Sequence, residues 1–383
     1  MDWPRHRVED LPPDEFEPPF CPKQACPSNA EDGLPASIRP NGSYTRQCDG
    51  RAIPRFMCRL CGASFSQQTF SCTYYLKRPE LLEPIAAGLN AGSAHRQLAR
   101  SLKCAPSTVT SQAARLGRFA ILFHTCVFDN IVKIEEPVIY DDFETFAYSQ
   151  DHPFGIGTSV GQGSWFVYHL ENAPHRRGGK VAQKHRKPGP EHCRPLPYKL
   201  AFSRMLDRLI PKADGRLDVI IDGHPGYQAA LRDHPERAGI KPMVHPTPER
   251  GPKGSKRTPY AVSRDHAMSP VDNLHKFIRH SVAHHRRETI AFGRRLNALM
   301  ERMYLMTAWR NFIKSRTERR PDKTTSAMAI GLTDEPWSWS RMLSQRIFYW
   351  RCEVPEAMAK IYRRDLTTTA VGRNQRHRLV NAF

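Results

Sequence analysis

The sequence predicts an α/β protein that carries two small modules ahead of its α/β domain. Two pairs of cysteines lie within residues 20–75, an Ala- and Leu-rich segment occupies residues 76–128, and short apolar runs that end in acids lie within residues 135–314. Strands and helices in this order are typical of an α/β domain. The acidic, proline-rich residues 1–19 predict a flexible leader, and residues 315–383 predict a basic C-terminal extension.

Cysteine spacing predicts the first module. The two pairs are Cys21 with Cys26 and Cys58 with Cys61. Each pair can lie on a tight turn, and four thiolates form a closed tetrahedral zinc site. Because so small a module cannot build a large core, a structural Zn²⁺ would supply much of its folding free energy. The alternative is a set of structural thiols without metal. Cys48 and Cys72 belong to no pair, so we expect them to be bystanders.

Helix signals predict a helix-turn-helix in the second module. Helices are expected over Leu81–Leu89, over Ser93–Leu102 and from Pro106 to Leu116. Ser93 is a favourable N-cap, and Pro106 suits the first position of a helix. This geometry places the last helix in the major groove of double-stranded DNA. The side chains expected to face the DNA are Thr108, Ser111, Gln112 and Arg115. The alternative is an ordinary helical hairpin.

The charge of the chain favours a polyanionic partner. There are 58 Lys and Arg against 38 Asp and Glu, a formal net charge of +20. Such an excess is the electrostatic footprint of a nucleic-acid-binding protein. Basic, Gly- and Pro-rich loops are expected at Arg176–Pro197 and at residues 245–264. No apolar run is long enough to span a membrane, and the N-terminus lacks the pattern of a secretory signal. We therefore expect a cytoplasmic protein with reduced cysteines.

Acids at the ends of two predicted strands indicate metal chemistry. Asp141 and Asp142 end the strand Val138–Tyr140, and Asp222 ends the strand Leu217–Ile221. Carboxylates delivered by two strands can bridge two divalent cations, Mg²⁺ or Mn²⁺, in phosphodiester chemistry. The alternative is that these acids are ordinary turn residues.

A third carboxylate is expected from a helix, or two helices in succession, between Val271 and about Lys314. The candidates are Asp272 and Glu288. Leu274 and Ile278 follow Asp272 at helical spacing and would pack its turn against the sheet, which favours Asp272. Glu288 stands beside two arginines, where an ion pair is expected. Asp272 could instead be a helix-capping acid.

The same segment contains a cluster of histidines, His275, His280, His284 and His285. His280 and His284 are four residues apart and could ligate a metal. Because no third ligand is evident, we expect these histidines to face solvent or phosphate.

Taken in order, these motifs resemble a known family of transposases, those similar to the transposase of insertion sequence one. The matching stretches are the cysteine pairs with Phe65-Ser66, the helix-turn-helix, Tyr140–Phe146, Ile221–Tyr227, Val271–His275 with Arg279, and Arg286–Phe292. The likeness covers roughly residues 20–314. Asp272 stands where the family has Glu, and Glu288 stands where it has a basic residue.

The resemblance implies a ribonuclease-H-like catalytic domain and an acid-triad transposase. In that case Asp141, Asp222 and Asp272 hold two Mg²⁺ ions, and the protein cuts and joins double-stranded DNA at the ends of an insertion sequence. It also implies a homo-oligomer assembled on DNA. The rival hypothesis is a catalytically inactive, transposase-derived DNA-binding protein. A structure-specific nuclease is a third, weaker hypothesis.

Overall fold

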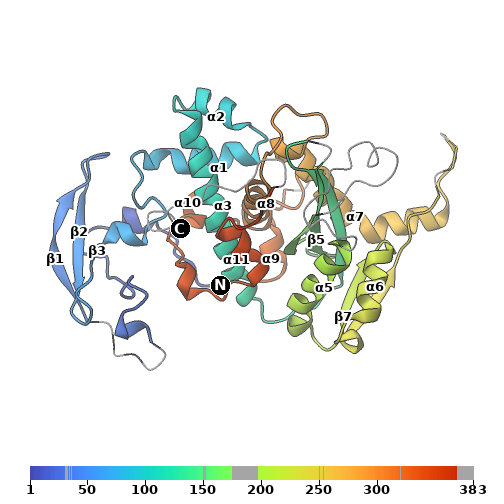
Figure 1. Cartoon of the computed structure of the whole chain (residues 1–383), viewed down its shortest axis with the longest axis horizontal. Helices are drawn as coiled ribbons and strands as arrows, with labels where there is room; N and C mark the ends of the chain where they lie inside the picture. Colours follow the sequence, from blue (N-terminus) through green and yellow to red (C-terminus); the bar gives the residue numbers. More distant parts are fainter. Residues whose placement is uncertain are drawn as a thin grey trace.

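The computed structural model shows a mixed α/β protein with two separate sheets. It describes residues 1–30, 33, 35, 37–149, 152–174, 197–249, 251–252, 254–319 and 321–368. The small antiparallel sheet contains β1 (Ile38–Thr45), β2 (Ala52–Cys58) and β3 (Ser64–Ser66), in that order. In Figure 1 this sheet lies at one end of the molecule and the larger sheet at the other, with α3, α8 and the C-terminal helices between them.

The larger sheet has five strands in the order β6-β5-β4-β7-β8. Its strands are β4 (Val138–Phe146), β5 (Pro153–Gly161), β6 (Val167–Pro174), β7 (Leu217–Ile221) and β8 (Ile240–Val244). β5 runs antiparallel to both β4 and β6, whereas β7 is parallel to β4 and β8 is parallel to β7. A Cβ atom at Gly157 of β5 would lie 2.0 Å from the hydroxyl oxygen of Tyr140. A glycine at this position therefore lets the tyrosine ring lie flat against the sheet.

Helices cover both faces of this sheet. On one face, Tyr140 of β4 packs against Phe202 of α5 (Pro197–Leu209) and against Tyr227 of α6 (Pro225–Asp233). On the other face, Phe143 of β4 packs against His275 of α7 (Pro259–Ser281). The two aromatic residues lie on opposite faces because successive side chains of a strand alternate.

The helices after β8 differ from the sequence expectation. α7 begins at Pro259, inside the expected basic loop, and continues through Pro270. A break follows, and α8 runs from Leu296 to Phe312. The first helix therefore starts well before Val271. Glu288 lies in the connection between the two helices and is exposed.

The segment predicted to form a helix-turn-helix contains α1 (Leu82–Asn90), α2 (His95–Ser101) and α3 (Pro106–Asp129). The 24-residue α3 extends beyond the predicted recognition helix, and its second half is almost entirely buried. There it belongs to the same hydrophobic core as α8 and the five-stranded sheet. The helical module and the α/β region therefore share one core.

The leader and the C-terminal segment also contribute to the interior, so the expectation of a flexible leader is wrong for the described chain. Trp3 is buried and its indole nitrogen donates a hydrogen bond to the carbonyl of Arg341 (2.9 Å). The C-terminal helices are α9 (Ser326–Ala329), α10 (Trp339–Met342) and α11 (Glu356–Tyr362). Short 3-10 helices lie at Val8–Asp10, Pro27–Asn29, Gln67–Phe70, Pro79–Leu81, Ile210–Lys212, Arg237–Gly239, Ala283–His285 and Tyr349–Arg351. Within the described ranges, no helix combines the length and apolarity that crossing a membrane requires.

Candidate metal centres and nucleic-acid interface

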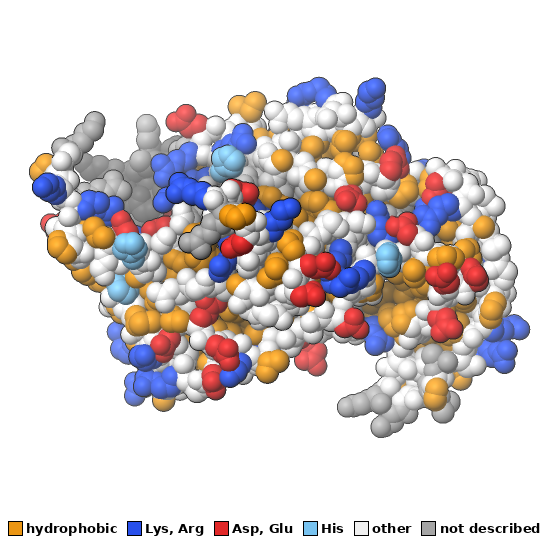
Figure 2. All heavy atoms as spheres, turned by 180° about the vertical axis from the view of Figure 1, so that it is seen from behind, with side chains coloured by type: hydrophobic (Ala, Val, Ile, Leu, Met, Phe, Trp, Pro, Cys, Tyr) orange, Lys and Arg blue, Asp and Glu red, His pale blue; other side chains and the backbone are white. Residues whose placement is uncertain are grey.

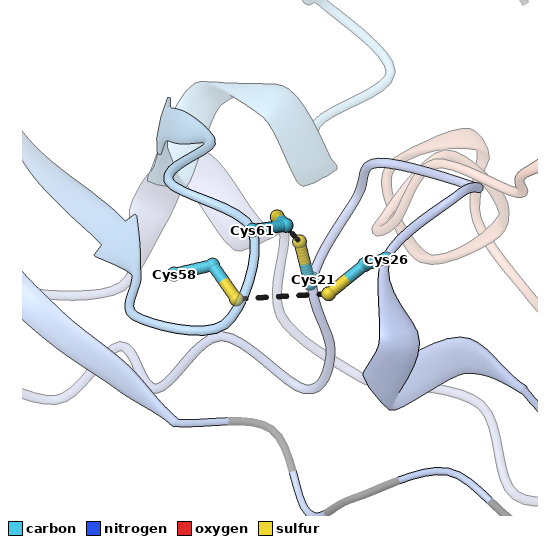
Figure 3. A group of neighbouring side chains, drawn as sticks. All are labelled: Cys21, Cys26, Cys58 and Cys61. Carbon is cyan, nitrogen blue, oxygen red and sulfur yellow. Dashed lines mark hydrogen bonds between the residues drawn. The ribbon is translucent and has the colours of Figure 1, made fainter.

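The two cysteine pairs come together in one cluster. The Sγ atoms of Cys21 and Cys61 lie 3.6 Å apart, and those of Cys26 and Cys58 lie 3.7 Å apart. All four sulfurs lie within 4.8 Å of one another. Figure 3 shows the four side chains pointing toward a common centre from two loops. The sequence prediction of which cysteines assemble is confirmed.

Tight turns hold each pair in place. Cys58 is the last residue of β2, and the amide of Gly62 donates to the Cys58 carbonyl (2.9 Å) across the turn that carries Cys61. Gly62 has a φ of +68°, a conformation that glycine adopts without strain. In the first pair, the amide of Cys26 donates to the carbonyl of Lys23 (2.9 Å). Backbone hydrogen bonds therefore close both turns that carry the cysteines.

The cluster fits the donor chemistry of a closed zinc site. Zn–S bonds of about 2.3 Å in a tetrahedron require sulfurs about 3.8 Å apart, close to the separations found here. Cys48 is exposed, and the thiol of Cys72 donates to the carbonyl of Gln345 instead (3.1 Å). As predicted, neither Cys48 nor Cys72 belongs to the four-cysteine cluster.

Asp141 lies beside Asp222, but inside β4, which continues to Phe146, and not at the end of a strand as the sequence predicts. β4 and β7 pair through Val138 with Val219 and through Ile139 with Ile220. Two residues beyond the pair Ile139 and Ile220, the same parallel register places Asp141 level with Asp222. Asp222 is the first residue after the end of β7. The side chain of Asp142 lies on the opposite face, where it accepts a hydrogen bond from the hydroxyl of Tyr227 (2.6 Å). The alternation of the strand thus separates two acids that are adjacent in sequence.

Electrostatics indicate that Asp141, Asp222 and Asp272 share one neighbourhood. The pKa of Asp141 is raised to about 7, first by burial and then by the negative charges of Asp222 and Asp272. Among the described residues, however, only the four cysteines form a group of three or more metal-ligand side chains within 4.8 Å of one another. The three carboxylates are therefore neighbours that lie further apart than the ligands of a closed site.

Asp272 lies well inside α7, and one of its oxygens (Oδ2) pairs with Nη1 of Arg264 at 3.0 Å. The sequence predicts a loop over residues 245–264, so it does not predict Arg264 as a site residue. A usable signal was present, since the side chain of Thr258 caps the helix and Pro259 occupies its first turn. The exposed Glu288 lies outside both helices, which agrees with the preference for Asp272.

His275 lies against the same acids, which corrects the expectation that it faces solvent or phosphate. Its Nδ1 is 3.7 Å from Oδ2 of Asp141, and its Nε2 is hydrogen-bonded to the hydroxyl of Thr158 (2.9 Å). Burial lowers the pKa of His275 to about 3, so the ring is neutral at physiological pH. His285 is also buried and is bonded to the hydroxyl of Thr145, whereas His280 is exposed.

Two of the four predicted DNA contacts are not on the surface. Ser111 is exposed and Thr108 partly so, but Gln112 and Arg115 are both only 7% exposed. The guanidinium of Arg115 donates to the carbonyls of Cys72 (3.1 Å) and Tyr74 (2.9 Å), and so ties α3 to the segment after the small sheet. The prediction that Gln112 and Arg115 face DNA is therefore wrong for this structure. The exposed cations beside the turn are Arg96, Arg100 and Lys103.

The basic loop expected at Arg176–Pro197 lies almost entirely outside the described residues. On the face shown in Figure 2, Lys and Arg side chains are interspersed with Asp and Glu, so that face carries no continuous basic patch. Net charge alone therefore does not locate a nucleic-acid interface.

Comparisons with protein families and with curated proteins identify no relative of this chain. No protein-family model matches the chain, and no curated protein matches its sequence. The functional argument therefore depends on the geometry of the two candidate metal centres.

Proposed function

We propose that this chain is a DNA transposase that cuts and joins double-stranded DNA at the ends of an insertion sequence. One observation carries the proposal. Asp141 of β4 stands level with Asp222, the residue after β7, and the charge of Asp272 on α7 reaches Asp141, whose pKa is raised first by burial and then by these two acids. Two strands and a crossing helix that supply three carboxylates are what an acid-triad, ribonuclease-H-like domain requires.

The donor set fits hard divalent cations. Asp141, Asp222 and Asp272 would hold Mg²⁺ or Mn²⁺, which bind carboxylate oxygens. Two such ions, when bound, would activate the attacking oxygen and stabilise the leaving oxygen of a phosphodiester. Burial is the largest cause of the raised pKa of Asp141, and the negative charges of Asp222 and Asp272 add to it, as expected where carboxylates gather in one site.

The remaining residues of the site position these acids. Arg264 balances the charge of Asp272 through its ion pair. The hydroxyl of Thr158 donates to the backbone carbonyl of Asp141 (2.9 Å), so the neutral His275 donates to Thr158 from Nε2. This chain of hydrogen bonds ties α7 to β4 and β5 at the level of the acids.

The four-cysteine cluster is a structural zinc site that stabilises the small sheet. Together with the exposed start of α3, this module binds DNA, and the active form is a homo-oligomer assembled on DNA. The zinc assignment follows from the cluster geometry, and the other two follow from the transposase proposal.

A second candidate is a catalytically inactive DNA-binding protein derived from a transposase. The observation that favours it is the ion pair between Arg264 and Asp272, which engages the third acid with a cation of the protein itself. The two candidates differ in whether DNA is cut when Mg²⁺ is supplied.

The test is strand cleavage and strand transfer in Mg²⁺ on DNA that carries the gene with its flanking sequences. We expect Asp272→Asn to lower the rate by more than about 100-fold, since changes to groups that merely support a metal ligand already cost about 10–100-fold. Glu288→Gln is the matched control and should retain activity. Activity in Asp272→Asn with none in Glu288→Gln would reverse the assignment, and no cleavage by the unaltered protein would favour the inactive candidate.

A further inference from the structure

A large groove separates the small sheet from the C-terminal segment. Its volume is about 1450 Å³, above the roughly 300–1,000 Å³ of a pocket for one small molecule. Three parts of the chain line it: the cysteine-bearing module, residues 73–77, and the C-terminal residues 346–350 and 362–363. A groove of this size, built by segments far apart in sequence, fits a chain-like ligand better than a compact one.

The groove has one sign of charge. No Asp or Glu is among its lining residues, which include the cations Lys23, Arg46, Arg55, Lys77, Arg346 and Arg363. Arg46 pairs with Asp49, and Arg363 pairs with Glu356 and Asp365, but these acids do not reach the groove. A concave surface lined by cations alone concentrates a polyanion.

Aromatic residues also line the groove. They are Tyr44, Phe65, Tyr74, Tyr75, Phe348, Tyr349, Trp350 and Tyr362. Arg346 lies over the ring of Tyr74 (4.9 Å) and over that of Phe348 (4.6 Å), so cation and ring surfaces are continuous on this wall. Rings interleaved with cations are what bases and phosphates of an unpaired strand bind.

Tyr75 is the ring most available to a ligand. Its side chain is 65% exposed, although an aromatic ring gains from burial. Its φ of +59° lies in the left-handed region, which is uncommon for residues other than glycine and is found at binding sites. The ring of Tyr74 contacts Tyr75 edge-on (centroids 4.4 Å apart), and Tyr44 is a second exposed ring of the groove, at 40%.

We propose that this groove binds single-stranded DNA, with bases stacked on Tyr75 and Tyr44 and phosphates near Lys23, Lys77 and Arg55. The rings distinguish this ligand from a duplex, since the bases of a duplex are already stacked on one another and offer no free face. Cations alone would suffice for duplex phosphates. The inference rests on no property of the carboxylates, so it stands whether or not the protein cuts DNA.

The test compares affinities of the full chain for three labelled probes. These are an oligothymidylate of about 12 nucleotides, within the site sizes of single-strand-binding folds, a duplex of equal length, and a polyglutamate peptide. We expect Tyr75→Ala to weaken binding of the single strand by about 5- to 150-fold and to leave duplex binding unchanged. Lys77→Gln should reduce the magnitude of the slope of log K against log salt by about 0.7 for the single strand.

Tyr148→Ala is the matched control, because Tyr148 is also exposed and also has a positive φ, but does not line the groove. It should bind all probes as the unaltered chain does. Unchanged single-strand affinity in Tyr75→Ala, or an equal loss on single strand and duplex, would overturn the proposal. Polyglutamate bound as tightly as the oligonucleotide would assign the groove to an acidic protein partner instead. The metal content of each variant verifies that the cysteine module is intact.

Discussion

Arg115 illustrates how burial decides the role of a charged side chain. At helical spacing it shares a face with Ser111, and the sequence therefore predicted a DNA contact. In the structure its guanidinium is 7% exposed and bonded to the carbonyls of Cys72 and Tyr74. Helical periodicity predicts which residues share one face of a helix. It does not predict which other segment of the chain covers that face. The covering segment here lies some forty residues earlier in the chain.

We predict that Arg115→Ala lowers the free energy of unfolding by about 1–3 kcal/mol for each buried carbonyl left without a donor. Urea denaturation would measure this loss. Arg96→Ala, an exposed change on α2, should leave the unfolding midpoint unchanged and weaken DNA binding. A stable Arg115→Ala protein with altered DNA sequence preference would restore the original recognition-helix assignment.

A second residue-scale prediction concerns acid stability. His124 of α3 is buried against His169 of β6, Arg208 of α5 and Tyr304 of α8. Burial, followed by the nearby His169 and Arg208, lowers the pKa of His124 to about 3, whereas in the unfolded chain it is about 6.5. The stability that depends on the neutral ring is therefore complete above pH 6.5 and is lost as the pH falls toward 3. The loss is at most about 1.4 kcal/mol per pH unit.

His124→Phe should reduce this slope between pH 7.5 and pH 5, as measured by urea unfolding at each pH. His280→Phe, which changes an exposed histidine, is the control and should keep the original slope. An unchanged slope in His124→Phe would mean that other groups carry the acid sensitivity.

The two candidate metal sites differ in how far the sequence could predict them. In the cysteine site, the two ligands of each pair are close in sequence and lie on one tight turn. Their spacing alone therefore indicates that they bind together. The acid site depends on strand register and on where α7 begins. The sequence pattern predicts Asp141, Asp222 and Asp272 as its acids, but it does not predict that Arg264 pairs with Asp272 or that His275 lies half-buried beside Asp141.

At the scale of elements, α7 shows why helix boundaries are difficult to predict. A proline inside a helix removes one hydrogen bond and usually ends it, so Pro270 favoured a start at Val271. The helix nevertheless begins at Pro259, where Thr258 accepts a hydrogen bond from the amide of Ala261 (3.1 Å). Packing of buried residues on both sides of Pro270, including Met268 and Leu274, offsets the cost of the proline.

The small sheet gives the element-scale prediction. We expect the purified protein to contain one Zn²⁺, and we expect Cys58→Ser to lose it, because a closed site needs four thiolates. Loss of the metal should loosen β2 and the aromatic cluster around Phe56 and Phe348. Elemental analysis and the near-ultraviolet circular dichroism spectrum would show both effects. Cys48→Ser removes an exposed thiol outside the cluster and should keep the metal. Zinc retained by Cys58→Ser would exclude the four-cysteine site.

At the scale of the whole molecule, the ends of the chain are part of its interior. The rings of Phe123 and Trp337 lie 5.2 and 6.0 Å from that of Trp3, so α3, the leader and the C-terminal segment meet at one point. Composition predicted a flexible leader because prolines and acids dominate residues 1–19. The composition of a segment does not reveal the role of a single tryptophan. The residues that contact Trp3 also lie more than a hundred residues away in sequence. Domain boundaries drawn from composition therefore missed the shared core.

This arrangement predicts that one residue of the leader stabilises the whole protein. Trp3→Ala removes a ring that is 6% exposed, together with its hydrogen bond to Arg341, and should cost about 3–5 kcal/mol of unfolding free energy. Because the core is continuous from α3 through α8 to the five-stranded sheet, we expect the urea midpoints reported by far-ultraviolet circular dichroism and by tryptophan fluorescence to fall together. Val132→Ala, at a position 89% exposed, is the control and should leave both midpoints in place. A Trp3→Ala protein as stable as the unaltered chain would show that the leader is only loosely attached, as its composition suggested.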